Sequence, residues 1–137
     1  MKSLQFKTML VSGGLIAFAF GLMSLISVQQ TPWVIDAKYK AMKNPVKADA
    51  TSLAAGKALW LKNCSSCHGK TGLGDGVKAR TLETPLEDYS KASFQALPDG
   101  ELFGKTKLGR DEMPKYDGKI SDEDIREAIL LVIEKLS

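Results

Sequence analysis

The chain has 137 residues, a formal net charge of +3, 44% hydrophobic residues and 26% charged residues. This length allows one domain with terminal extensions, and the composition is that of an ordinary globular protein. The excess positive charge lies near the N-terminus, because residues 49–137 carry 13 basic residues against 15 acidic ones. No basic patch is interleaved with aromatic residues, so the sequence argues against a nucleic-acid partner.

The first 48 residues divide into an apolar block and a more polar stretch. Residues 9–28 are twenty consecutive uncharged residues, which is enough to cross a bilayer and more than the apolar core of most secretory signals contains. Two lysines precede this block, and no small-residue cleavage site follows it. We therefore predict that residues 1–28 form a transmembrane helix, used as a membrane anchor or uncleaved signal. Residues 29–48 contain two prolines and are predicted to be a tether.

The first predicted helix of the remaining domain covers residues 52–61. These residues are good helix formers, and Thr51 or Ser52 is the expected N-cap. Gly56 lies inside the helix, where glycine costs about 1 kcal/mol relative to alanine. Either another backbone approaches closely at this point or the glycine is there by chance. Trp60 is predicted to be a core residue rather than a cofactor contact.

Two further helices are predicted toward the C-terminus. Residues 99–108 form a short helix that is capped by Asp99 and ends at Gly109. The last helix begins with a capping box at residues 121–124 and continues with apolar residues at helical spacing. Those residues are expected to pack against the first helix: Ile125, Ala128, Ile129, Val132, Ile133 and Leu136. No segment has a strand pattern, so we predict an all-α fold.

Both cysteines and the single histidine lie within five residues, Cys64-Ser65-Ser66-Cys67-His68. Cysteines three residues apart lie on the same side of a helical turn, so both thiols can form thioether bonds along one porphyrin edge. His68 follows directly and can reach the iron as an axial ligand. A dithiol redox site usually requires a βαβ setting, and a zinc site would have only three candidate ligands. The motif therefore predicts one covalently bound haem c.

The sixth ligand of the iron must come from a residue other than histidine. Methionine is the usual partner of histidine in cytochromes c, and Met113 is the single methionine within residues 49–137. It lies in a polar loop 45 residues beyond His68. The alternative is that Met113 only fills space in that loop. Leu102 and Phe103 are expected to face the haem. Pro85 is a candidate to orient His68, by leaving a backbone carbonyl free to accept from the imidazole Nδ1–H.

These features together resemble the class I (monohaem) c-type cytochromes of the membrane-anchored bacterial type. The resemblance covers residues 51–136 and rests on Gly56, Trp60, Cys64, Cys67, His68, Gly74-Asp75-Gly76 and Met113-Pro114. It implies a small cytochrome c fold over residues 49–137, with three to four helices around one haem, preceded by the transmembrane helix. It also implies that Cys64 and Cys67 attach the haem and that His68 and Met113 bind its iron. One departure is the aliphatic face around Val132, where many relatives carry an aromatic residue.

The resemblance further implies one-electron transfer rather than enzymatic turnover. The chain would be a membrane-tethered carrier or a relay subunit of a respiratory chain, with the haem domain on the periplasmic (outer) side of the cytoplasmic membrane. Its partners would be a redox protein donor and acceptor, or a respiratory complex. Five lysines are candidates for the docking face, and the alternative is an ordinary solvated surface, since Asp111 and Glu112 nearby leave the sign of that face open: Lys70, Lys78, Lys105, Lys107 and Lys115. The alternative function is a haem-based sensor or peroxidase in which the sixth position of the iron is open.

Overall fold

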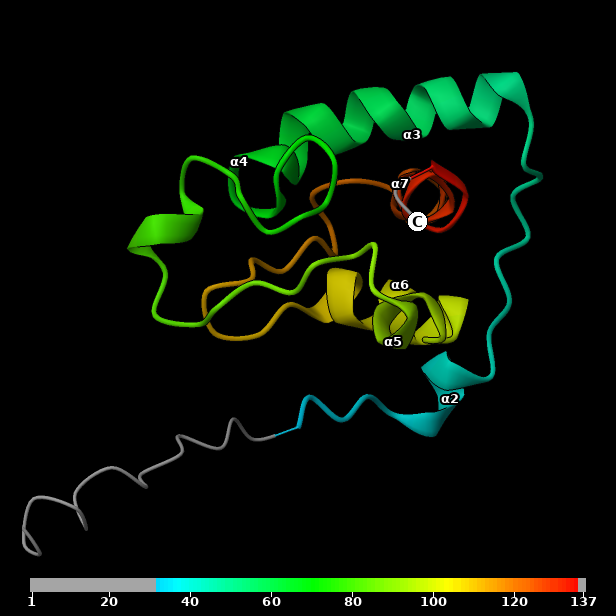
Figure 1. The fold of residues 1–137 in the computed structure, drawn as a ribbon. Coiled ribbons are helices and arrows are strands. Elements are labelled where there is room, and N and C mark those ends of the chain that lie inside the picture. The colour runs from blue at the N-terminus through cyan, green and yellow to red at the C-terminus, as the bar shows by residue number, and fades with distance from the viewer. Residues whose placement is uncertain (1–31, 136–137) are drawn as a thin grey trace, which may run out of the picture. The chain divides into compact units, whose positions relative to one another are not determined.

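The computed structural model describes residues 32–135, which form helices joined by loops (Figure 1). In chain order these are α2 (Ala37–Lys40), α3 (Ala50–Asn63), α4 (Ser65–His68), the 3-10 turn η2 (Ala79–Thr81), α5 (Ala92–Gln95), α6 (Asp99–Leu108) and α7 (Asp122–Lys135). Within the described residues no strand forms, so the all-α prediction is confirmed there. None of the described helices is long and apolar enough to span a membrane. The predicted anchor, residues 1–28, lies outside the described range.

Helices α3 and α7 cross and form the centre of the fold (Figure 1). The buried residues of α3 are Ser52, Gly56 and Trp60, whose four-residue spacing places them on one face of the helix. A Cβ atom added to Gly56 would collide with the backbone carbonyl of Glu127 on α7. Close approach of a second backbone therefore explains this glycine, and the predicted packing of the two helices is confirmed.

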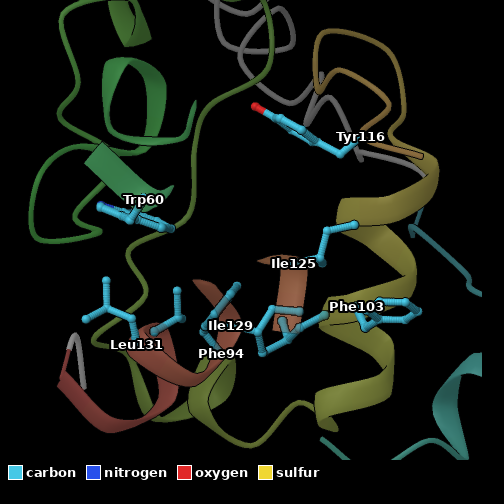
Figure 2. Packing of buried hydrophobic residues seen from close by; sticks show 9 residues of the cluster. Trp60, Phe94, Phe103, Tyr116, Ile125, Ile129 and Leu131 are labelled. Atoms are coloured by element: carbon cyan, nitrogen blue, oxygen red, sulfur yellow. The ribbon is translucent and has the colours of Figure 1, made fainter. Parts of the chain in front are cut away.

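The hydrophobic core lies around α7, between α3 and α6. Figure 2 shows Ile125 and Ile129 of α7 between Trp60 on one side and Phe103 on the other. The buried members of this core are Trp60, Phe94, Leu102, Phe103, Tyr116, Ile125, Ile129, Leu131 and Val132. Burial of a large apolar side chain stabilises a fold by roughly 1.5–3 kcal/mol, so this cluster is the main source of stability in the described part of the protein. The predicted apolar stripe is buried at residues 125, 128, 129 and 132, and Leu136 lies outside the described residues.

The helix N-caps agree with the sequence prediction for α7 but differ for α3 and α6. At α7 the predicted capping box is present, since the Asp124 N–H donates to the Ser121 Oγ at 3.0 Å. The N-cap of α3 is Asp49 rather than Thr51 or Ser52, and its carboxylate accepts from both of their backbone N–H groups at 3.0 Å. Helix α6 has the predicted bounds, but no side chain caps it. The Asp99 carboxylate instead accepts from the distant Asn44 N–H.

Residues 34–48, which belong to the predicted tether, pack against α6 and α7 in the same compact unit as the rest of the domain. Ile35 is only 4% exposed, and the Tyr39 ring lies 6.2 Å from the Phe103 ring, centroid to centroid. The Asn44 side chain donates to the Arg126 carbonyl at 2.8 Å. The carboxylate of Glu101 on α6 pairs with Lys40 at 3.5 Å. We call residues 34–48 the N-terminal strap, because these contacts hold it along the helices.

Candidate functional site

The predicted attachment motif lies where α3 ends and α4 begins. Cys64 joins the two helices, and the His68 N–H donates to its carbonyl at 3.0 Å, which closes one helical turn. Both thiols are free and half-buried, and the turn places them on the same side of the helix. Burial, together with the neighbouring Cys67 thiol, raises the pKa of Cys64 to about 12. Its thiol is therefore neutral at pH 7.

The glycine-rich loop after the motif folds back over α4. Gly69 leaves the helical conformation with a φ of 83°. The Gly74 N–H then donates to the His68 carbonyl at 2.9 Å, and the Gly76 N–H donates to the Cys67 carbonyl at 3.1 Å. A Cβ atom at Gly76 would collide with the same Cys67 carbonyl. The loop thus satisfies the last carbonyls of a very short helix, which fixes the direction in which His68 leaves the backbone.

The imidazole of His68 is buried among aromatic side chains. Its ring centroid lies 6.0 Å from that of Trp60 and 5.1 Å from that of Tyr89, and burial lowers the pKa of His68 to about 4. The ring is therefore neutral at pH 7, as a metal ligand must be. Its Nδ1 atom lies 2.9 Å from the Tyr89 hydroxyl. The partner of Nδ1 is thus Tyr89 and not the predicted Pro85, which leaves Nε2 as the nitrogen available to a metal.

Met113 is carried by a tight turn between α6 and α7. The backbone groups of Arg110 and Met113 form two reciprocal hydrogen bonds, of 3.0 and 2.8 Å. Asp111, in the turn between them, has a φ of 50°, a left-handed conformation that Asp and Asn tolerate better than most residues. The turn holds the Met113 side chain half-buried against the hydrophobic core.

One mainly apolar cavity brings the predicted ligands together. Cys64, His68 and Met113 all line it, and the rest of its wall comes from Trp60, Tyr89, Phe94, Leu102, Thr106, Ala128, Ile129 and Val132. Leu102 faces the cavity as predicted. Phe103 does not line it, and that prediction was wrong: its ring packs against Tyr39 and lies 4.1 Å from the Arg126 guanidinium carbon.

Cys67 does not line this cavity, but it lies on the same helical turn as Cys64, and together these donors fit a haem c. Two thiols on one helical turn match the two vinyl groups of a porphyrin, and a neutral imidazole and a thioether are the two axial ligands found in cytochromes c. The volume of this cavity is about 50 Å³. A larger, open hollow lies near the starts of α3 and α7, but its lining contains no cysteine, histidine or methionine.

The helical fold and this cavity define a small c-type cytochrome. Comparison with known proteins agrees, because residues 51–131 match the family described as "Cytochrome C oxidase, cbb3-type, subunit III". The chain therefore belongs to this family of c-type cytochromes, binds a haem c covalently, and acts by haem-based electron transfer.

Three relatives named cytochrome c6 are similar to this chain. The protein of Gracilaria tenuistipitata var. liui is 30% identical over 87 residues, which are 63% of this chain and 75% of the relative. That of Synechocystis sp. is 32% identical over 87 residues, or 63% of this chain and 68% of the relative. That of Leptolyngbya boryana is 30% identical over 83 residues, or 60% of this chain and 91% of the relative.

Sequence reasoning assigned no role to Tyr89, although the structure places it beside His68. Its ring stacks on Phe94 at 3.9 Å between centroids, and its N–H donates to the Gly72 carbonyl at 2.8 Å. The available signal was the single aromatic residue of residues 82–91, a segment in which polar residues are the majority. Such a residue has to bury its ring somewhere nearby, but the sequence does not say against which partner.

Replacing Tyr89 by phenylalanine should raise the midpoint potential of the haem. Iron binds an unprotonated nitrogen, so ligation through Nε2 leaves the proton on Nδ1, where it donates to the Tyr89 oxygen. This bond adds negative character to the imidazole and favours the ferric state. Its loss should raise the potential by up to roughly 40 mV, the one-electron equivalent of a hydrogen bond of ~1 kcal/mol.

Potentiometric titration of the two variants Tyr89→Phe and Tyr116→Phe checks this prediction. Tyr116 is the matched control, because its hydroxyl donates to the Asn63 carbonyl at 2.7 Å and not to His68. Its removal should cost a similar hydrogen bond and leave the potential unchanged. Equal potentials in both variants would contradict the role given to Tyr89.

Proposed function

We propose that this protein is a membrane-tethered one-electron carrier, or a relay subunit of a respiratory chain, with His68 and Met113 as the two axial ligands of its haem iron. The observation that carries the proposal is the shared cavity. Residues 45 positions apart in the sequence, on α4 and on the turn before α7, line the same apolar space together with Cys64. No other methionine of the described residues lines it.

Haem supplies the ferric–ferrous couple, which carries one electron per cycle. Cys64 and Cys67 would hold the group covalently from their shared helical turn at the end of α3. His68 offers a neutral imidazole because its surroundings lower its pKa to about 4. Met113 offers a thioether, which favours the ferrous state and so raises the potential. With both axial positions held by side chains, oxygen or peroxide has no position at which to react.

The surface around α4 is the best candidate for docking redox partners. Of the five lysines proposed from sequence, Lys105, Lys107 and Lys115 pair with acidic side chains at 2.9, 2.6 and 3.2 Å. Lys70 and Lys78, in the loop that folds over α4, form no ion pair with another described residue. The same loop exposes Leu73 by 47% and Val77 by 87%. An apolar surface with unpaired positive charge suits a short-lived complex with an acidic redox partner.

The tether is proposed from the uncharged block in residues 9–28 and from the family. The match to a family described as an oxidase subunit favours a relay within a complex, whereas the relatives named cytochrome c6 favour a separate carrier. The outer side of the cytoplasmic membrane is proposed because relatives of this class attach haem there. Washing membranes at alkaline pH tests the tether: the full-length chain should stay in the membrane fraction. A mature N-terminus near Gln29 in mass spectrometry would contradict it.

The absorption spectrum of the purified ferric protein tests the ligation. A thioether on ferric haem gives a weak absorption band near the red end of the visible spectrum, and we expect this band in the wild-type protein at pH 7. Denatured protein should retain the mass of one haem. A ferric protein without the band that reacts readily with peroxide would instead indicate a sensor or peroxidase with an open sixth position.

A further inference from the structure

The carboxylate of Glu112, next to Met113, connects two loops that are distant in sequence. Its Oε1 atom accepts from the Glu83 N–H at 3.1 Å, and its Oε2 atom accepts from the Thr84 N–H at 3.0 Å. Two consecutive backbone donors thus meet the two oxygens of one carboxylate. Such charge-assisted pairs are stronger and more directional than a single neutral hydrogen bond.

The segment that Glu112 holds leads directly to His68. Residues 83 and 84 are bound by Glu112, and five residues later the Tyr89 N–H donates to the Gly72 carbonyl at 2.8 Å. The Tyr89 hydroxyl then lies 2.9 Å from the His68 Nδ1. Residues 83–89 are therefore fixed at one end to the turn that carries Met113 and at the other end to His68.

The hydrogen bonds of the turn that carries Met113 differ in how far they reach along the chain. The reciprocal hydrogen bonds between Arg110 and Met113 only close the turn, and Asp111 contacts its own neighbour Arg110 at 3.3 Å. The Glu112 side chain, in contrast, reaches backbone N–H groups 29 and 28 residues away. A change of its side chain would therefore leave the hydrogen bonds of the turn intact and remove its link to residues 83 and 84.

We propose that Glu112 is a positioning residue for Met113, which it holds at the haem iron by binding the turn to the backbone of residues 83 and 84. This inference rests on the proposed function, in which Met113 is the sixth ligand. In the protein with haem bound, the Met113 sulfur stays on the iron for a larger fraction of the time because its turn cannot move away from residues 83–89.

Imidazole binding to the ferric protein measures this effect, because imidazole must displace the Met113 sulfur. In Glu112→Ala both hydrogen bonds are lost, and the apparent Kd for imidazole should fall about tenfold, the equivalent of ~1.4 kcal/mol. In Glu112→Gln one side-chain oxygen still accepts, so the Kd should fall by less. The red-end absorption band should weaken more in Glu112→Ala than in Glu112→Gln.

Asp111→Asn is the matched control. It removes the same charge from the same turn, and Asn is well tolerated at a positive φ, but it leaves both Glu112 hydrogen bonds in place. Its Kd should stay within about twofold of the wild type. The proposal is overturned if Asp111→Asn and Glu112→Ala have equal effects, since loss of charge alone would then explain them, or if the Glu112→Ala Kd is unchanged.

The same measurements give a different result if the proposed function itself is wrong. If Met113 does not bind the iron, the wild-type ferric protein lacks the red-end band, and wild type and Met113→Ala bind imidazole with the same Kd. If Met113 does bind but Glu112 does not position it, the wild-type band is present and only the response of the Glu112 variants is missing. Far-UV circular dichroism of each variant verifies that the helices are retained.

Discussion

Replacing Met113 by alanine is expected to remove the red-end absorption band and to lower the midpoint potential by on the order of 0.2 V. The thioether stabilises ferrous iron, and axial ligands together set haem potentials over a range of roughly 0.8 V. The core itself should remain folded, because Met113 is only half-buried at its edge and lies in a surface turn. Imidazole and cyanide should bind the ferric variant much more tightly than the wild type.

Met42→Ala is the control for this variant. Met42 is the other methionine of the described residues; it lies in the N-terminal strap, is 37% exposed, and contacts Arg126 at 3.9 Å through its sulfur. Its loss should change neither the band nor the potential. Optical spectra and potentiometric titrations of both variants test whether Met113 is the sixth ligand of the iron. A Met113→Ala protein that keeps the band and the wild-type potential would show that another group binds the iron.

Local features of this protein could be predicted from the sequence because short-range geometry determines them. The spacing of Cys64 and Cys67 defines one helical turn wherever it lies in the chain. The capping box at Ser121 and the stripe that begins at Ile125 depend only on neighbours a few residues away. Met113 was found by elimination, as the single methionine of the domain, and the structure places it beside the cavity that His68 lines.

Contacts between distant segments could not be predicted in the same way. The partner of the His68 Nδ1 is the hydroxyl of Tyr89, 21 residues away, and a nearby proline was an equally reasonable expectation. The N-terminal strap has the polar, proline-containing composition of a linker. The buried Ile35 nevertheless anchors it, and Asn44 binds it to α6 through its backbone N–H and to α7 through its side chain. A single buried side chain and a few hydrogen bonds are too small a signal to detect in a sequence.

Replacing Gly56 by alanine is expected to destabilise the protein by about 2–3 kcal/mol, although the same exchange in an open helix would be favourable by about 1 kcal/mol. The reason is the α3–α7 crossing, where the new Cβ atom would collide with the Glu127 carbonyl. A backbone carbonyl inside a helix cannot rotate away as a side chain can. The two helices must therefore separate, and the contact of Trp60 with the apolar face of α7 loosens with them.

Gly104→Ala distinguishes this backbone clash from a general intolerance of larger residues. A Cβ atom at Gly104 would lie 2.8 Å from the Ile35 Cγ2 and 3.0 Å from the Tyr39 Cβ, both of which are side-chain atoms of the strap. Its cost should stay below that of Gly56→Ala, because the strap can shift without separating α3 from α7. Guanidinium chloride unfolding of the haem-bound proteins, followed by circular dichroism, compares the two midpoints. If Gly56→Ala unfolds at the same denaturant concentration as Gly104→Ala, the helices are not in backbone contact at this crossing.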